Sequence, residues 1–453
     1  MVKRHVVGIS VCLTLAVAAA CLAIPASVGA APAQALNKPP EGFVALFNGK
    51  DLTGWKGLLK SPYDSPAERA KLTPEQLKEL QKEADENMRA HWKVVDGVLV
   101  FDGKGRSLCT AKDYGDFEML VDWKIEKAGD SGIYLRGSPQ VQIWDTARAD
   151  VGAQVGSGGL YNNQKNPSKP SKVADKPVGE WNSFRLGMIG ERVTVTLNDE
   201  IVTDNVIMEN YWERDKPIYP TGQIELQNHG NFLYFRNIYI RELPREKGVN
   251  KLTDDEQKQG FTQLFNGTDL TGWVGGPQGY AIRDGVLVID PSLGGGGNLL
   301  TDKDYGDFVF RFEFRLSPGA NNGVGIRTPE SGDAAYQGME IQILDDVSPR
   351  YRGWLNEYQR HGSIYGVVPA KTGFQKLWGL WNSEEITAKG KQITVKLNGE
   401  TIVDADIEKA STPKTIDGHD HPGLQRAAGR IGFCGHGDYL EIRNVRIKSL
   451  DAK

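Results

Sequence analysis

A long internal duplication constrains the fold of this chain more than any other feature of its sequence. The segment Gly42–Trp55 reads GFVALFNGKDLTGW, and the segment Gly260–Trp273 reads GFTQLFNGTDLTGW. Shorter matches follow in the same order in both halves, such as KDYGDF at 112–117 and at 303–308. A period of roughly 200 residues is much longer than a solenoid repeat, so the pattern predicts two copies of one domain.

The repeat also suggests where the domains begin and end. The chain has 453 residues, which is enough for two or three domains. The first copy is expected at 40–244 and the second at 260–450. The polar stretch at 245–259 is expected to be a linker between them.

The first 35 residues differ from the rest of the chain. Lys3 and Arg4 precede an apolar run from Val6 to about Val28, and small residues follow it. This pattern predicts a signal peptide at 1–35 and therefore an exported, periplasmic or extracellular protein. A membrane anchor and a lipid attachment at Cys21 are the alternatives. No later segment is apolar enough to predict a membrane span in the mature chain.

Charge and cysteine content narrow the classes of partner. The formal net charge is -4, and without a polybasic tract nucleic acid or an anionic membrane is not expected as the main partner. Beyond the N-terminal segment the cysteines are Cys109 and Cys434, which do not occupy corresponding positions in the two copies. They are predicted to be buried thiols rather than a disulfide or a metal site.

Period-two alternation dominates both copies. In the second copy, Phe308, Phe310, Phe312 and Phe314 alternate with residues that are mostly charged. Such alternation indicates antiparallel strands with one buried face. Frequent Gly, Asn-Gly and Asp-Gly turns separate the strands, so we predict an all-β chain in which each copy is a β-sandwich or jelly roll.

The first copy alone carries a segment with a helical pattern. Residues 73–89 begin with Thr73 as the expected N-cap, Pro74 at the first helical position and Glu75 in the first turn. We predict a short helical insertion on the surface of the first sandwich.

Residues 129–145 predict a hairpin with one apolar and one polar face. The stretch reads GDSGIYLRGSPQVQIWD. Its polar face would carry Tyr134, Arg136, Gln140, Gln142 and Trp144. Amides and guanidinium groups pair with hydroxyls, and aromatic rings cover the apolar faces of sugars, so this face predicts carbohydrate binding. A solvated sheet face without a ligand is the alternative.

At these residues the chain resembles the 3-keto-disaccharide hydrolase domain family. The resemblance lies in the FNGxDLxGW opening, the DYGDF strand, the hairpin at 129–145, GSGGLYN at 156–162 and GEWN at 179–182. It covers nearly all of both copies. The resemblance implies a concanavalin or laminin-G-like jelly roll, and a hydrolase or lyase that cleaves the glycosidic bond of sugars oxidised at C3.

The chemistry of such a substrate sets what the site needs. A ketone at C3 acidifies the C2 proton, so the reaction requires a base, an acid for the leaving group and a group that stabilises the enolate. In the second copy we predict Glu340 or His436 as base, Arg327 as oxyanion partner and Asp345 as orienter or metal ligand. Further candidates are Gln342 and His361.

The first copy departs from this set. Its equivalent positions are Arg136, Gln140, Gln142, Asp145 and His229. Because a glutamine cannot act as base, Asp145 or His229 would have to serve, or this copy only binds sugar. The aspartates could instead form strand-end turns, and each His-Gly pair a tight turn with a packed imidazole. The predicted substrate contacts are Tyr134, Gln140, Gln142, Trp144, Tyr161 and Tyr365.

The sequence also suggests candidates for a cofactor and for partners. A divalent metal ion is a candidate cofactor, although Asp417–His421, which reads DGHDH, is better explained as a solvated loop. An oligosaccharide or glycoside is the expected substrate, and a separate sugar 3-oxidoreductase would have to supply it. A carbohydrate-binding protein and a cell-surface adhesion module are the competing functions.

Overall fold

The computed structural model describes residues 36–243, 249–294 and 297–451, so the predicted signal peptide lies outside the described residues. The first half contains two antiparallel sheets. The larger sheet contains, in spatial order, β11 (Glu200–Ile207), β10 (Arg192–Leu197), β9 (Asn182–Ile189), β6 (Phe117–Ile125), β13 (Phe232–Glu242), β4 (Val98–Asp102) and β3 (Trp92–Val95), with β1 (Val44–Ala45) paired to β13. The smaller sheet contains β2 (Trp55–Gly57), β5 (Leu108–Thr110), β12 (Glu225–Leu226), β7 (Asp130–Leu135) and β8 (Ser138–Trp144).

The second half repeats this arrangement with the same two sheet sizes. Its larger sheet contains β16 (Tyr280–Arg283), β17 (Val286–Ile289), β26 (Leu440–Ser449), β19 (Phe308–Leu316), β22 (Asn382–Lys389), β23 (Gln392–Leu397) and β24 (Glu400–Asp406), with β14 (Thr262–Gln263) paired to β26. Its smaller sheet contains β15 (Trp273–Gly275), β18 (Asn298–Thr301), β25 (Arg430–Gly435), β20 (Asn321–Thr328) and β21 (Met339–Leu344). The predicted all-β class of two jelly-roll-like sandwiches is confirmed.

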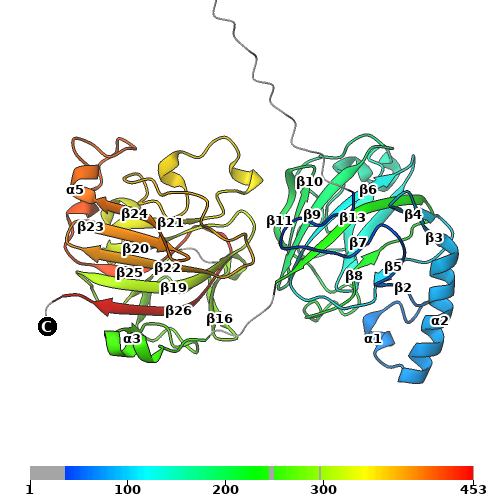
Figure 1. The fold of residues 1–453 in the computed structure, drawn as a ribbon, viewed down its shortest axis with the longest axis horizontal. Helices are drawn as coiled ribbons and strands as arrows, with labels where there is room; N and C mark the ends of the chain where they lie inside the picture. Colours follow the sequence, from blue (N-terminus) through cyan, green and yellow to red (C-terminus); the bar gives the residue numbers. More distant parts are fainter. Residues whose placement is uncertain (1–35, 244–248, 295–296, 452–453) are drawn as a thin grey trace, which may run out of the picture. The chain divides into compact units, whose positions relative to one another are not determined.

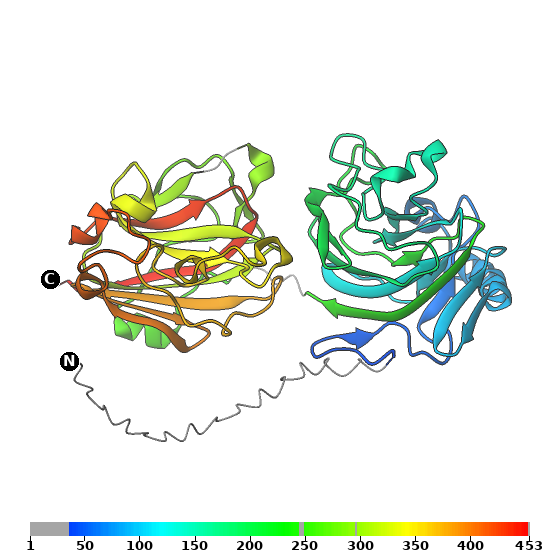
Figure 2. The same ribbon diagram turned by 90° about the horizontal axis from the view of Figure 1, so that it is seen from above.

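The cores lie between the two sheets of each half, as the alternation predicts. Phe308, Phe310, Phe312 and Phe314 are at most 1% exposed and belong to one apolar cluster. The alternate residues of β6 form the corresponding cluster in the first half. In the second view the long green strand β13 runs beside β6 through the first sandwich (Figure 2). Cys109 and Cys434 are free, buried thiols, as predicted.

Helices are few and short, apart from one. They are α1 (Pro66–Arg69), α2 (Pro74–His91), α3 (Asp254–Gln259), α4 (Ala334–Gln337) and α5 (Ile407–Ala410). Single 3-10 turns occur at η1 (Ala149–Val151), η2 (Ala153–Val155), η3 (Pro291–Leu293), η4 (Pro349–Tyr351), η5 (Glu357–Gln359) and η6 (Pro422–Gln425). Within the described ranges, no helix has the length and apolar character needed to cross a bilayer.

The predicted insertion is helix α2, which lies beside β2 and β3 (Figure 1). Its N-cap Thr73 forms a capping box with Gln76, and Pro74 occupies the first turn. Two side chains of the helix form hydrogen bonds with β2. Gln81 donates to the Gly57 carbonyl at 2.9 Å, and Asp85 accepts from the Gly57 amide at 3.0 Å. The insertion is therefore anchored at one edge of the smaller sheet.

The stretch predicted as a plain linker also contains a helix. Helix α3 begins after Thr253, which shares a capping box with Glu256, and it ends at Gly260 with a φ of +85°. The signal was in the sequence, because Thr-x-x-Glu is the pattern of a capping box. The polar composition of 245–259 obscured it.

Candidate functional site

The smaller sheet of each half has one face in the core and a polar face on the other side. In β7 and β8 of the first half, Ile133, Leu135, Val141 and Ile143 are fully buried in the apolar cluster, as the hairpin pattern predicts. The intervening side chains project from the opposite, polar face. Only part of the predicted set of residues lies on these two polar faces.

On the second sandwich, Glu340 and His436 form a close pair. Glu340 lies on β21, and His436 directly follows β25. The His436 Nε2 atom lies 2.7 Å from the Glu340 carboxylate. Glu340 is 5% exposed, whereas the His436 side chain is 41% exposed. Both line a cavity of about 460 Å³, together with Asp333 and Cys434.

This pair is suited to proton transfer. The hydrogen bond to Glu340 raises the pKa of His436, while burial of the ring acts in the opposite direction. The contact with Glu340 therefore favours the protonated form of the His436 ring. One acid and one base within hydrogen-bond distance are thus present at the edge of a cavity.

Arg327 is not brought together with this pair. Its guanidinium donates to the carbonyls of Gly306 at 3.0 Å and Gly390 at 2.7 Å, and to Asp307 at 3.0 Å. Arg327 is 1% exposed and does not line the cavity of Glu340 and His436. These contacts link loops to one another. The role of Arg327 as an oxyanion partner remains a prediction.

Arg136 occupies the equivalent position in the first sandwich. It donates to the carbonyls of Gly115 at 2.8 Å and Gly190 at 2.7 Å, and to Asp116 at 2.6 Å. The same loop-binding arrangement therefore occurs twice, which favours a structural role for both arginines.

Asp145 and Asp345 also hold loops. The Asp145 carboxylate accepts from the amides of Ala128 and Ala147 at 2.8 and 2.9 Å. The Asp345 carboxylate accepts from the Gly319 amide at 2.8 Å, and burial raises its pKa to about 6. These bonds correspond to the strand-end alternative for both residues.

His361 lies inside the second sandwich rather than on its polar face. Its ring stacks on Phe314 at 5.2 Å between centroids, and its Nε2 atom lies 3.2 Å from Glu384, which is buried. Gln342 is on β21 and donates to Asn321 at 2.7 Å. Tyr365 accepts a hydrogen bond from Gln359 at 3.3 Å.

On the first sandwich, amides and an aromatic pair occupy the predicted face. Gln140 donates to Gln142, which donates to Asp130 at 2.8 Å. His229 Nδ1 lies 3.8 Å from the Asp130 carboxylate, at the exposed end of this chain of polar groups. Trp144 and Tyr161 meet edge to face at 5.6 Å and line a cavity of about 180 Å³. These groups suit sugar binding.

The sequence interpretation missed a charged row on the same sheet. Strand pairing places Lys56, Cys109, Glu225 and Tyr134 side by side across β2, β5, β12 and β7. Gln223 donates to Glu225 at 2.7 Å. The alternation in GQIELQ at 222–227 was a usable signal, since it separates Ile224 and Leu226 from the polar residues.

Burial raises the pKa of Glu225 to about 7, although the hydrogen bond from Gln223 opposes this shift. A carboxyl with a pKa near neutrality can both accept and donate a proton. The first sandwich therefore has an ionisable acid on its polar face even though Gln140 replaces Glu340.

The raised pKa of Glu225 predicts a pH-dependent stability. In the unfolded chain the carboxyl ionises near pH 4.5, so the folded state loses stability as pH rises from there through about 7. The loss should reach about 3 kcal/mol. The Glu225→Gln variant should therefore gain stability relative to the native protein between pH 4 and pH 8, measured by calorimetry.

Glu86→Gln, a change on the exposed side of α2, is the matched control. Its difference in stability from the native protein should not depend on pH. If the stability difference between Glu225→Gln and the native protein stayed constant across the same pH range, the raised pKa of Glu225 would be contradicted.

The described residues contain no group of three or more His, Cys, Asp or Glu side chains placed to hold a metal ion. In the DGHDH segment, His421 lies 2.9 Å from Asp417 and 3.1 Å from the Ala335 carbonyl. Gly418, His419 and Asp420 are exposed, as expected of a solvated loop, whereas the His421 ring is buried at its end.

The smaller sheets of the two sandwiches carry amides, aromatic rings and a carboxylate–imidazole pair, and such groups are typical of proteins that bind or act on carbohydrates. A family model, the 3-keto-alpha-glucoside-1,2-lyase-like domain, matches residues 42–241 and 260–448. The chain belongs to this family and carries two copies of its domain.

The chain is also similar to individual proteins. A 3-keto-disaccharide hydrolase from Bacteroides thetaiotaomicron is 24% identical over 276 residues, which cover 48% of this chain and 84% of that protein. Two crystal structures of candidate glycosyl hydrolases from Parabacteroides distasonis are 27% and 31% identical. They cover 45% and 42% of this chain and 99% of their own, with TM-scores of 0.39 and 0.38. The family and the Bacteroides relative support a glycoside hydrolase-type enzyme.

Proposed function

We propose that this protein is an exported enzyme that cleaves the glycosidic bond of 3-keto-glycosides, including 3-keto-disaccharides. The observation that carries the proposal is the Glu340–His436 pair, which places a carboxylate and an imidazole 2.7 Å apart at a cavity on the polar face. Family membership supplies the substrate class. The signal-like sequence at 1–35 supports export.

The pair accounts for an elimination followed by hydration. The Glu340 carboxylate takes the proton from C2, and the electron pair of that C–H bond passes to the C3 ketone as an enolate. The enolate re-forms its carbonyl, C1=C2 forms, and the C1–O bond breaks while the His436 imidazolium protonates the leaving oxygen. Water then adds across C1=C2, so the net reaction is hydrolysis without any change of redox state.

This chemistry requires an oxidised sugar, so a separate oxidoreductase that acts at C3 must precede it. An unoxidised glycoside has no acidic C2 proton for Glu340 to remove. We therefore infer that the parent disaccharide is not a substrate at this site.

A direct test incubates the purified protein with a 3-keto-disaccharide and with the parent disaccharide, each with and without a chelator. Release of the leaving sugar from the keto substrate alone is the expected result. The chelator arm reports whether a divalent ion takes part. Tight binding of both sugars without turnover would instead favour a carbohydrate-binding protein.

The first sandwich favours binding as a second function. Gln140 stands where the second sandwich has Glu340, and Tyr161 offers exposed aromatic surface with the buried Trp144 ring edge to face beside it. An amide-rich face with an aromatic platform is typical of sugar recognition. The two copies are therefore expected to differ in what they do with a sugar.

A further inference from the structure

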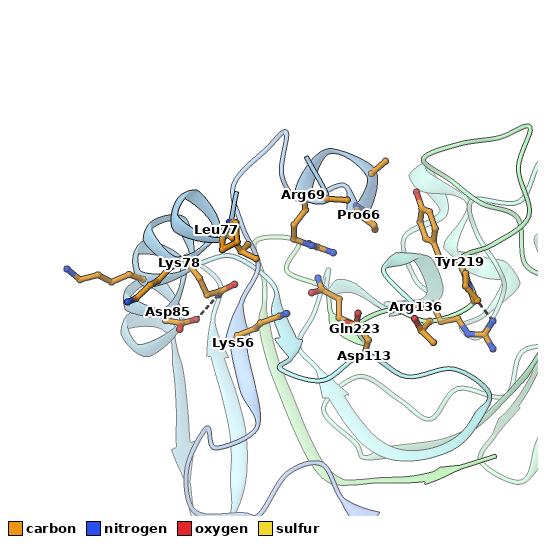
Figure 3. Close-up of a pocket in the computed structure, with 18 of the residues that line it drawn as sticks. Lys56, Pro66, Arg69, Leu77, Lys78, Asp85, Asp113, Arg136, Tyr219 and Gln223 are labelled. Carbon is orange, nitrogen blue, oxygen red and sulfur yellow. Dashed lines mark hydrogen bonds between the residues drawn. The ribbon is translucent and has the colours of Figure 1, made fainter. Parts of the chain in front are cut away.

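A large cavity in the first sandwich lies between the helical insertion and the smaller sheet. It has a volume of about 1150 Å³, which is large enough for a disaccharide. Its walls come from β2, α1, α2 and the segment 213–223. The cavity is shown in Figure 3.

Helix α1 is held close to the sheet at the β7–β8 turn. A Cβ atom built on Gly137 would lie 3.0 Å from Pro66 Cγ and 3.9 Å from Arg69 Nη2. Gly137 has a φ of +73°, so the turn needs a glycine for its backbone as well as for this close approach. Arg69 is therefore positioned by packing rather than extended freely into solvent.

Cationic side chains from separate elements converge in this cavity. Figure 3 shows Lys56 and Arg69 directed toward Gln223, one from β2 and the other from α1. Among the residues that the structure describes, the Arg69 head group donates a single hydrogen bond, to the Tyr63 carbonyl at 3.4 Å. Lys78, Lys82 and Arg89 on α2 add positive charge to the same lining.

Most acidic groups of the lining already have partners. Asp85 accepts from Gly57 and from Gln81. Glu213 pairs with Lys216 and accepts from Tyr219. Asp113 is the remaining carboxylate in the lining. Lysines and arginines outnumber carboxylates in the lining, and the buried Glu225 beneath it is the further acidic group that Lys56 and Arg69 face.

The second sandwich lacks the elements that form one wall of this cavity. Its sequence lacks the insertion that carries α1 and α2. Arg430 occupies the position of Gln223, and it pairs with Asp304 at 3.1 Å and donates to the Thr301 carbonyl at 3.0 Å. The insertion thus gives the first copy a pocket of its own.

We propose that the cavity between α1, α2 and the smaller sheet binds a saccharide that carries an anionic substituent, with Arg69 and Lys56 contacting the anion and Gln223 a sugar hydroxyl. A carboxylate, a sulfate and a phosphate share the required charge and acceptor oxygens. This site stands apart from the Glu340–His436 pair and does not depend on turnover there.

Calorimetric titration of the full chain tests the proposal, with Glu340→Gln as the background so that no reaction interferes. The probes are glucuronosyl-glucose, its neutral analogue cellobiose, glucose 6-sulfate, glucose 6-phosphate and sodium sulfate. The acidic disaccharide should bind at least tenfold more tightly than cellobiose, and the difference should shrink in high salt. The two monosaccharide esters report which anion is preferred.

Two variants assign the binding to this cavity. Arg69→Gln and Lys56→Gln should each lower the affinity for the acidic disaccharide at least fivefold. Because there are two variants, the result does not depend on the folding of either one alone. Lys71→Gln is the matched control, because Lys71 belongs to the same insertion but is exposed and pairs with Glu68. Equal affinity for the acidic and neutral disaccharides, or full affinity in both variants, would overturn the proposal. Binding of sodium sulfate as tightly as the disaccharide would also overturn it.

Discussion

Replacing Glu340 by glutamine is expected to lower kcat on a 3-keto-disaccharide about 100-fold or more. The amide keeps the size of the side chain and can still bond to His436, but it cannot take the C2 proton. Because Glu340 already makes its contact in the free enzyme, KM should change much less than kcat. Steady-state release of the leaving sugar measures both parameters.

The matched control is Glu408→Gln, which makes the same chemical change on the exposed surface of α5. Its kcat should stay within twofold of the native value. If Glu340→Gln also kept its kcat, Glu340 would not be the base, and the site would have to be sought elsewhere.

The second large effect is expected from Arg327→Met, and it is an effect on stability. The substitution removes hydrogen bonds to two carbonyls and to Asp307 and leaves those acceptors without their donor. The cost should be about 3 kcal/mol. For a domain of this size, that corresponds to a fall in Tm of roughly 6 to 12 °C in calorimetry.

Arg352→Met provides the control, since Arg352 is exposed and should change stability by less than about 0.5 kcal/mol. The same variants separate the two roles considered for Arg327. A 100-fold fall in kcat with an unaltered Tm is the outcome expected of an oxyanion partner, and it would contradict the structural role.

Sequence periodicity predicted the all-β class and the buried face of the strands. The four phenylalanines of β19 and the apolar set of the β7–β8 hairpin lie in the cores as the alternation predicts. The duplication explains why both halves have the same sheet sizes and strand order. Helix α2 also followed from its own cap and first turn.

Tertiary contacts decided the rest of the candidate site. Periodicity can place a residue on a face, but it cannot say that Arg327 turns back to bind carbonyls or that His361 packs on Phe314. Glu225 was on a recognisable strand, yet its neighbours Lys56 and Tyr134 come from distant segments. Pairing between strands far apart in sequence cannot be deduced from local pattern alone.

Nuclear magnetic resonance of the reaction in D2O tests the central claim most directly. If Glu340 removes the C2 proton and water adds afterwards, the released 3-keto sugar should carry deuterium at C2 from the first turnovers. In the Glu340→Gln variant, release of the sugar and exchange at C2 should both slow about 100-fold or more. A native enzyme that releases product with its original C2 proton would contradict the proposed mechanism.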